Sequence, residues 1–518
     1  MGVVRCRTSG AAPAPIPKPS TLTYPTYLDM KRIRLLTLFT ALFALVSLTA
    51  CDSIVDDTID PIDSVADSEL NDPDDVEFLI NGIIARSNNV QDNLTVQAGL
   101  ISDQFIFGGG IGGGATFPTF RDLMRGLPAD TNPLNNNSVD GTQNHLGQYR
   151  FLADNLLARA ENLGAEAFGG TDDPRWQNAQ FAGNFHGGIA RYYWAAYFGQ
   201  TQREGGGVIS EVDGPTDAER SEFIPSAQMY DLAVEKLDAA LPFASPYQER
   251  VINSVKARIA LFQNEVAEAA SLAENGLEAG DDPFQNEYVD RSGNQANVWH
   301  TQGGVGRTQA VSALRFFYGE GYSDEVFLID DATDFDQDPN EFSRIPLFDG
   351  VDAGVVTEDG NLAAPDRGYV IEIREDLGLQ PGDTVPFYAQ GRYINRGANI
   401  NFITWQEMNL IRAEAAERSG DSAGALALIN EVRASHDLDD LELADYDGMN
   451  TIFVERDKEM FSTGIRLVDQ RRATEFNLDA EGLDLDLHGW HLDETVWWYL
   501  PITLAERLNN PNLPNELP

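Results

Sequence analysis

Apolar residues recur at helical spacing along most of the chain. The segment 68–87 has capping and acidic residues followed by an i, i+3, i+4, i+7 stripe made of Val76, Leu79, Ile80, Ile83 and Ile84. The segments 144–163 and 178–198 show the same periodicity. The second of them is apolar around so much of its circumference that it is predicted to be a buried helix. The pattern therefore predicts a mainly α protein.

Two stretches are typical of helical hairpins. The first contains expected helices at 227–241, 251–262 and 265–277, with Ser226 as the cap of the first helix. The helices 251–262 and 265–277 form the hairpin, which ends at Gly276 and Gly280. The second contains Phe402–Ser419 and Ser422–Ser435, separated by Gly420-Asp421, where glycine ends one helix and aspartate caps the next. These pairs resemble tetratricopeptide-type hairpins, although the period of roughly 34 residues is not kept.

The segment 281–400 breaks this helical pattern. Gly, Asp, Asn and Pro are frequent in it, and short apolar pieces such as Glu325–Leu328 and Tyr369–Ile373 are candidate strands. The segment is too long for a simple loop, so we expect an irregular, partly β excursion built onto the helical scaffold. The glycine-rich stretch 108–114 is a second irregular region.

Residues 30–51 have the order of parts found in a bacterial lipoprotein signal. A basic cluster after Met30 precedes an apolar run of about a dozen residues, which is short for a membrane span, and the run ends in Leu48-Thr49-Ala50-Cys51. The last four residues resemble a lipobox, in which the chain is cut before the cysteine and its thiol is acylated. The sequence therefore predicts lipidation of Cys51 and attachment to a membrane through lipid. A core helix that happens to end in cysteine explains the order of parts less well.

These features predict a four-part organisation. Residues 1–29 fit no targeting class and are interpreted as a mis-assigned start or non-structural extension, with Met30 as the true beginning. Residues 30–50 are the signal peptide and 51–66 an acidic, flexible tether. Residues 67–518 form one domain that carries the insertion at about 281–400.

The charge of the chain is strongly negative. There are 36 Lys and Arg against 82 Asp and Glu, giving a formal net charge of −46. Such a surface repels phosphates, so nucleic acid is excluded as a partner. The composition favours adaptation to concentrated salt, which screens repulsion, over a role in binding a cationic ligand. With only Cys6 and Cys51, the chain after cleavage has no disulfide framework.

The C-terminal third contains three sequence patterns in a fixed order. The pattern "AEA…GD…A…IN.VR" is matched at Glu414-Ala415, Gly420-Asp421, Ala425, Ile429-Asn430 and Val432-Arg433. The pattern "ER..EL..EG.R..DL.R" is matched at Glu455-Arg456, Glu459-Met460, Gly464, Arg466, Asp469 and Arg472. The closing "PIP..E…NP.L" is matched at Pro501-Ile502, Glu506, Asn510-Pro511 and Leu513, and further matches lie upstream at Tyr197-Phe198-Gly199 and Gly206-Gly207. In this order the patterns resemble the SusD/RagB family, the nutrient-binding outer-membrane lipoproteins of the starch-utilisation type in Bacteroidetes-like bacteria.

The sequence departs from these patterns at three positions: Thr463, Gln470 and Thr503 stand where Glu, Leu and Pro are usual. From the residues alone, the charged motif around Glu455, Arg456 and Arg472 indicates inward-turned ion pairs that fix how helices meet, rather than ligand contacts.

The resemblance implies a non-enzymatic protein at the outer membrane, facing outward. It would capture an oligosaccharide or a peptide and deliver it to a SusC-like, TonB-dependent transporter, without a cofactor. Ligand sites in the family are built from irregular segments early in the chain and in the mid-chain excursion. The aromatic and basic residues of those segments are therefore the candidate ligand-binding residues: Phe105, Phe117, Phe120, Arg121, Trp299, Arg315, Phe316, Phe317 and Tyr318. For each residue taken alone, core packing is the better interpretation, whereas the position of the whole set in glycine-rich segments favours exposure of some of its members.

The sequence gives weaker indications of metal binding, of catalysis and of other functions. Asp334, Asp336 and Asp338 begin like a calcium loop but continue wrongly for an EF-hand, and His488 and His491 lack an evident third ligand, so no metal site is predicted. Carboxylates are too abundant to single out a glycosidase pair. A helical-repeat scaffold lipoprotein that binds protein partners, with the aromatic residues of 281–400 buried, stays an alternative, and a lipid-anchored glycoside hydrolase is a third.

Overall fold

The computed structural model describes residues 70–102, 104–106, 118–124, 136–209, 222–290, 296–302, 311–312, 347–349, 388–390, 392–393, 395–478 and 497–513. The chain divides into two units, Met1–Leu70 and Asn71–Pro518. All of the first unit except Leu70 lies outside the described residues, so the signal peptide, Cys51 lipidation and the tether stay predictions.

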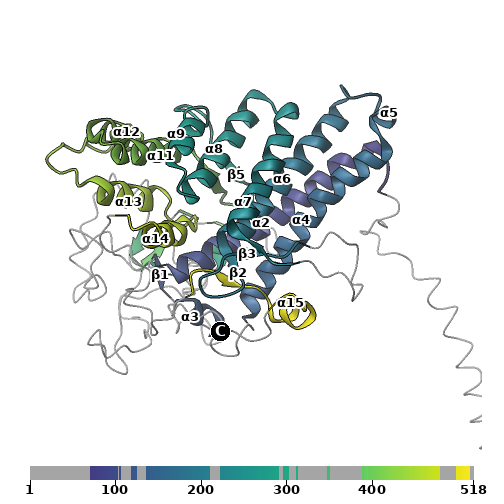
Figure 1. Cartoon of the computed structure of the whole chain (residues 1–518), viewed down its shortest axis with the longest axis horizontal. Coiled ribbons are helices and arrows are strands. Elements are labelled where there is room, and N and C mark those ends of the chain that lie inside the picture. Colours follow the sequence, from purple (N-terminus) through teal and green to yellow (C-terminus); the bar gives the residue numbers. More distant parts are fainter. Residues whose placement is uncertain are drawn as a thin grey trace, which may run out of the picture. The chain divides into compact units, whose positions relative to one another are not determined.

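The described part of the second unit is mainly helical, which confirms the predicted fold class (Figure 1). Its longer helices are α2 (Val76–Ile101), α4 (Asn137–Leu163), α6 (Pro174–Tyr197), α7 (Ser226–Ala240), α8 (Pro246–Phe262), α9 (Val266–Ala273), α11 (Trp405–Arg418), α12 (Ser422–Ala434), α13 (Gly448–Glu459) and α14 (Ile465–Glu475). Shorter helical pieces are η2 (Pro73–Asp75), α3 (Pro118–Met124), α5 (Ala165–Phe168), η4 (Leu241–Phe243), α10 (Val298–Gln302) and α15 (Leu504–Asn509). None of the helices in this part of the chain combines the length and apolar character needed to cross a membrane.

Helix α6 is the central helix of the scaffold and packs against α2, α4 and α7 (Figure 1). Its C-terminal half is buried on all sides, as its sequence predicts. Two glycines allow the close approach of neighbours: a Cβ at Gly183 would lie 2.5 Å from Leu157 Cγ, and one at Gly188 would lie 2.9 Å from Leu237 Cγ. The aromatic side chains of α6 then fill the space between the helices, which forms the main core.

Helix α2 begins later and ends later than the apolar stripe predicts. Its start is fixed by the preceding turn, where Asp72 accepts the Asp74 N–H at 2.9 Å and Pro73 begins η2. The C-terminal half continues to Ile101 although many of its buried residues are polar: Ser87, Asn88, Asn89, Gln91, Asp92, Thr95 and Gln97. A pattern of apolar positions does not detect this half of the helix, because polar residues are buried among the apolar ones.

The two predicted helical hairpins are present as α8–α9 and α11–α12. Gly420 has a φ of 87° after α11, and the Asp421 carboxylate accepts the Gly424 N–H at 2.9 Å as the cap of α12. Several boundaries were predicted wrongly. Helix α8 begins at Pro246 rather than at residue 251, and α9 ends at Ala273 rather than at residue 277. Ser226 lies within α7 and its hydroxyl donates to the Ala195 carbonyl, and Phe402 belongs to a strand rather than to α11.

Short strands join distant parts of the chain. An antiparallel sheet has the order β1-β6-β8-β7, made of Phe105–Ile106, Val311–Ser312, Tyr388–Gln390 and Leu347–Asp349. The strand β5 (Phe284–Asn286) pairs with β9 (Ile400–Ile403), and β3 (Gly206–Gly207) pairs with β4 (Ile224–Pro225). The strand β10 (Leu500–Pro501) runs parallel to β2 (Phe198–Gly199) and ties the C-terminal segment to the end of α6. The mid-chain excursion is therefore partly β; the predicted strands Glu325–Leu328 and Tyr369–Ile373 lie outside the described residues.

The charged C-terminal motif forms a buried ion network. Arg472 donates to the Glu414 carboxylate at 2.7 and 2.8 Å, which joins α14 to α11. Arg456 on α13 and Arg472 both donate to Asp469. Burial would raise the pKa of Glu414, but the Arg472 guanidinium lowers it below its usual value. These contacts confirm that the motif fixes helix packing.

Candidate functional site

The described aromatic residues of the predicted binding set pack inside the protein. The strand pairing of β1 with β6 brings the early segment and the mid-chain excursion together, as the prediction requires. Phe105 and Trp299 are fully buried, with their ring centroids 4.6 Å apart, and Phe120 on α3 is 5% exposed. Within the structure described, these three rings serve core packing, and their faces are not open to a ligand.

The other residues of the predicted ligand-binding set lie wholly or partly outside the description. Arg121 lies in α3, but its side chain is outside the description, as are five whole residues of the set: Phe117, Arg315, Phe316, Phe317 and Tyr318. The acidic triplet at 334–338 and the histidines at 488 and 491 also lie outside the described residues. Within the described ranges, no group of three or more His, Cys, Asp or Glu is arranged to hold a metal ion. The predicted ligand-binding set therefore stays a prediction.

The buried polar face of α2 explains why Trp299 is held inside. The Asp92 carboxylate accepts the Val298 N–H at 3.0 Å, and the Thr95 hydroxyl accepts the indole N–H of Trp299 at 2.8 Å. Burial raises the pKa of Asp92 well above its usual value. Helix α2 thus supplies hydrogen bonds to the excursion where a helix face usually supplies apolar contact.

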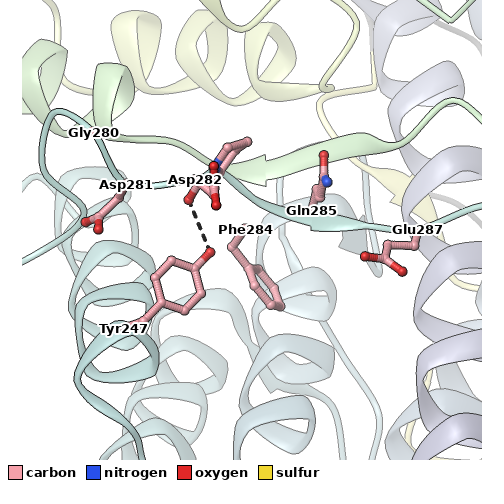
Figure 2. A pocket seen from close by; sticks show the side chains of 8 residues that line it. Tyr247, Gly280, Asp281, Asp282, Phe284, Gln285 and Glu287 are labelled. Carbon is pink, nitrogen blue, oxygen red and sulfur yellow. Dashed lines mark hydrogen bonds between the residues drawn. The ribbon is translucent and has the colours of Figure 1, made fainter.

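An open hollow lies where the excursion leaves the scaffold (Figure 2). Its volume is about 720 Å³, and it is lined by the start of α8 and by the turn and strand of β5: Tyr247, Gly280, Asp281, Asp282, Pro283, Phe284, Gln285 and Glu287. Figure 2 shows the Tyr247 ring rising from α8 toward the turn and the Phe284 ring hanging from the strand beside it. The Tyr247 hydroxyl donates to the Asp282 carbonyl at 3.2 Å, which ties the helix to the turn.

A second, more apolar hollow adjoins the first and shares Tyr247 and Phe284 with it. Its volume is about 220 Å³, and its other lining residues are Phe181, Phe185, His186, Ser245, Gln248 and Val251. The Phe181 and Phe185 rings stack at 5.3 Å, and Phe284 meets Phe185 edge-on at the same distance. The two hollows together are named the Tyr247–Phe284 hollow. It combines ring faces with carboxylates and an amide, which is the chemistry that binds a sugar.

Two charged groups at the edge of the hollow are fixed by an ion pair. Arg250 donates to both oxygens of Asp281, with the Nε–Oδ2 distance at 2.8 Å, and this hydrogen bonding lowers the pKa of Asp281. Partial burial, and then the carboxylates of Asp281 and Asp282, raise the pKa of Tyr247. The negative field of the turn therefore reaches the ring that lines the hollow.

Sequence reasoning found only part of this hollow. The residues 281–287 belong to the predicted excursion. Phe181 and Phe185 belong to a predicted buried helix, whereas Tyr247 lies between two predicted helices. The only sequence signal for Tyr247 is its place in the first turn of α8, next to the capping pair Ser245 and Gln248. Whether such a ring faces core or solvent is decided by the return of β5 over the helix end, which local sequence does not specify.

The comparisons with known proteins agree on one family. Residues 383–516 match the family model described as the SusD family. A SusD superfamily protein from Bacteroides vulgatus ATCC 8482 has the same fold, with 16% identity, a TM-score of 0.55, and coverage of 85% of this chain and 98% of that chain. The C-terminal part of the chain therefore matches the SusD family, and the chain has a SusD-like fold. No curated protein matches the sequence.

Two further SusD-like structures are similar at the level of the fold. A SusD-like carbohydrate binding protein from the same strain has 14% identity, a TM-score of 0.53, and coverage of 86% of this chain and 98% of that chain. Surface glycan-binding protein A from Bacteroides uniformis has 16% identity, a TM-score of 0.50, and coverage of 85% and 98%. The SusD-family match in this chain contains the ion network of α11, α13 and α14, so the most recognisable part of the sequence is structural rather than ligand-binding.

Proposed function

We propose that this SusD-like chain is a surface-exposed lipoprotein of the outer membrane that captures an oligosaccharide without chemical change. It then delivers the sugar to a SusC-like, TonB-dependent transporter. The observation that carries the proposal is the SusD-like fold, shared across 86% of the chain with a protein described as carbohydrate binding. A peptide ligand was an equal alternative on sequence alone; the glycan-binding descriptions of two similar structures favour the sugar.

The Tyr247–Phe284 hollow supplies a place for one or more sugar units. Flat rings stack on the apolar faces of pyranose rings, while carboxylates and amides accept or donate hydrogen bonds to hydroxyl groups. Tyr247 and Phe284 provide such rings, and Asp282, Gln285 and Glu287 provide the polar groups. The predicted ligand-binding residues outside the description, among them Phe117 and Tyr318, stay candidates for further contacts with the sugar.

The lipid on Cys51 would give the capture step its advantage. An acylated cysteine anchors the chain stably when several acyl chains are present. Tethering then keeps the bound sugar close to the transporter and raises its effective concentration there. The acidic tether of residues 51–66 would let the domain reach over its partner.

The ion pair of Asp281 favours a role for this carboxylate in binding rather than in hydrolysis. A glycosidase needs one carboxylic acid with a raised pKa to protonate the leaving oxygen. Asp281 has a lowered pKa because Arg250 is hydrogen-bonded to it, so it is a poor proton donor. This arrangement favours an anionic group that orients or attracts a ligand.

A glycan-binding screen tests the proposal. The full chain with Cys51→Ala, which prevents acylation, is applied to an array of neutral, basic and acidic oligosaccharides, and to a peptide library in parallel. We expect saturable binding to at least one oligosaccharide, recovered at its original length by chromatography. Binding only to peptides, or shortening of the bound glycan, contradicts the proposal.

One observation favours the second candidate, a scaffold lipoprotein that binds protein partners. That alternative predicts buried aromatic residues in 281–400, and Trp299 and Tyr393 are both buried. Phe284, however, is only partly buried and lines the hollow. Co-purification of a soluble envelope protein, together with failure to bind any glycan in the screen, is the result that this candidate predicts.

A further inference from the structure

The charged side chains that line the Tyr247–Phe284 hollow are all carboxylates. Asp282 and Glu287 are exposed carboxylates at its edge, and the Asp281 carboxylate is already paired with Arg250. Among the described residues that line the two parts of the hollow, there is no lysine or arginine. The site therefore holds carboxylates whose charge its own lining does not neutralise.

The lining has one basic side chain, His186, and it is neutral at ordinary pH. Burial lowers its pKa to about 4, and its Nδ1 atom is hydrogen-bonded to the Tyr149 hydroxyl at 2.8 Å. The histidine therefore adds no positive charge to the apolar part of the hollow. It contributes a flat, uncharged ring beside Phe185, with centroids 5.3 Å apart.

The helix end that borders the hollow is also closed to anions. Free N–H groups at a helix N-terminus attract negative charge. At the start of α8, however, the Ser245 hydroxyl accepts the Gln248 N–H and the Gln248 side chain accepts the Ser245 N–H. Glu249 adds a carboxylate to the same turn. An acidic sugar would therefore meet carboxylates without a compensating positive charge from the lining.

We infer that the Tyr247–Phe284 hollow selects oligosaccharides that carry free amino groups, over acetylated or uronic-acid sugars. The sugar ring would stack on Tyr247 or Phe284, and its ammonium group would lie near Asp282 or Glu287. This inference rests on the proposed glycan-capture function and deepens it by naming the chemical class. The inference rests on the carboxylates that line the hollow and not on the overall acidity of the chain.

The test compares three hexasaccharides by isothermal titration calorimetry of the full chain with Cys51→Ala: a β-1,4-glucosamine hexamer, its fully N-acetylated form, and a hexagalacturonate. We expect the glucosamine hexamer to bind at least about threefold more tightly than the acetylated form, since each exposed ion pair contributes modestly. We expect no binding of the galacturonate. The preference should shrink in 0.5 M salt, because screening weakens exposed charge interactions.

Variants separate this site from non-specific attraction to an acidic protein. Asp282→Asn with Glu287→Gln should abolish the preference for the amino sugar, whereas Asp440→Asn, at an exposed carboxylate outside the hollow lining, should leave it unchanged. Tyr247→Ala should weaken binding of both the amino and the acetylated hexamer by roughly tenfold. Tyr247→Phe keeps the ring and should retain most of the affinity.

The outcomes distinguish the inference from the function on which it rests. If no oligosaccharide binds the unmodified chain, either in this titration or in the glycan screen, both fail. If sugars bind but amino and acetylated forms bind equally, or the hollow variants change nothing, the inference fails while glycan capture survives. Equal binding of hexagalacturonate likewise overturns the charge selection.

Discussion

Single glycines of α6 determine how closely this helix approaches its neighbours. A Cβ at Gly188 would lie 2.9 Å from Leu237 Cγ and 3.0 Å from the Ala233 carbonyl oxygen on α7. The second contact is with backbone, which cannot rotate away. Close helix contact here positions α6, and with it Phe181, Phe185 and the wall of the hollow.

Gly188→Ala is therefore expected to lower the free energy of unfolding by about 1–3 kcal/mol, the usual cost of overpacking. The matched control is Gly147→Ala on α4, where an added Cβ meets nothing within 4 Å. The control should stabilise the protein by about 0.5–1 kcal/mol, because alanine suits a helix interior better than glycine. Urea unfolding followed by circular dichroism measures both; equal effects of the two changes would refute the close-packing account.

Some residue-level predictions from sequence succeeded because the chemistry restricts the choice. Burying the charged side chains of Arg456, Asp469 and Arg472 is very costly unless they pair with opposite charges. Their motif therefore indicates an ion network, which the structure confirms. Phe105 and Trp299 were harder to interpret, since an aromatic ring in a glycine-rich segment suits either a ligand or a core. The position of the ring relative to α2 decides this, and that contact is distant in sequence.

The helices of the C-terminal third are held together by buried charge. Glu414 on α11 accepts two hydrogen bonds from Arg472 on α14, and both side chains are almost fully buried. A second buried pair, Arg258 with Glu407, joins α8 to α11. Helix α11 therefore links the hairpin α8–α9, which borders the hollow, to the family-specific C-terminal helices.

Glu414→Gln leaves the buried guanidinium of Arg472 with only Asp469 as its opposite charge, and Arg456 also pairs with that carboxylate. We expect a loss of about 3–5 kcal/mol in the free energy of unfolding, as for other buried pairs broken on one side. The control Asp74→Asn removes an exposed partner of Arg175, with the Asp74 side chain 80% exposed, and should cost less than about 1 kcal/mol. A Glu414→Gln variant as stable as the control would show that the network contributes little.

The same network predicts how stability depends on pH. Its arginines lower the pKa values of Glu414 and Asp469 below the ordinary values of these carboxyl groups. At acid pH the folded state therefore binds fewer protons than the unfolded state. The stabilisation is present above the unfolded pKa values and is lost as the pH falls through the folded ones. Melting temperatures measured between pH 7 and pH 3 should fall less steeply for Glu414→Gln than for the unmodified chain. Parallel curves would contradict the assigned role of Glu414.

At the element scale, apolar periodicity predicted helices but not all of their ends. The hairpins were found because glycine and aspartate between α11 and α12 have specific backbone roles. The C-terminal extent of α2 was missed because many of its buried residues are polar. One of them, Asp92, accepts a hydrogen bond from the backbone of the excursion at Val298. Only the part of the hollow in the excursion was predicted from the sequence. The hollow forms where β5 lies beside the start of α8, and this contact joins segments that are distant in sequence.

The whole molecule combines an expected lipid anchor, a helical scaffold and an acidic, aromatic hollow. Its SusD-like fold is established by comparison, whereas the anchor on Cys51 and the transporter partner are parts of the proposed function. The Cys51→Ala variant should lose acyl labelling and move from the membrane to the soluble fraction. Retention of label and membrane association would show that another group anchors the chain.

Binding of a fluorescent oligosaccharide to intact cells tests surface capture most directly, with the sugar taken from the glycan screen. Cells producing the unmodified chain should be labelled, and cells producing Cys51→Ala should not. Cells producing Tyr247→Ala should carry as much surface protein, measured with an antibody, but bind roughly tenfold less sugar. Unlabelled cells that display the unmodified chain, or full labelling with Tyr247→Ala, would contradict capture of a glycan at the Tyr247–Phe284 hollow.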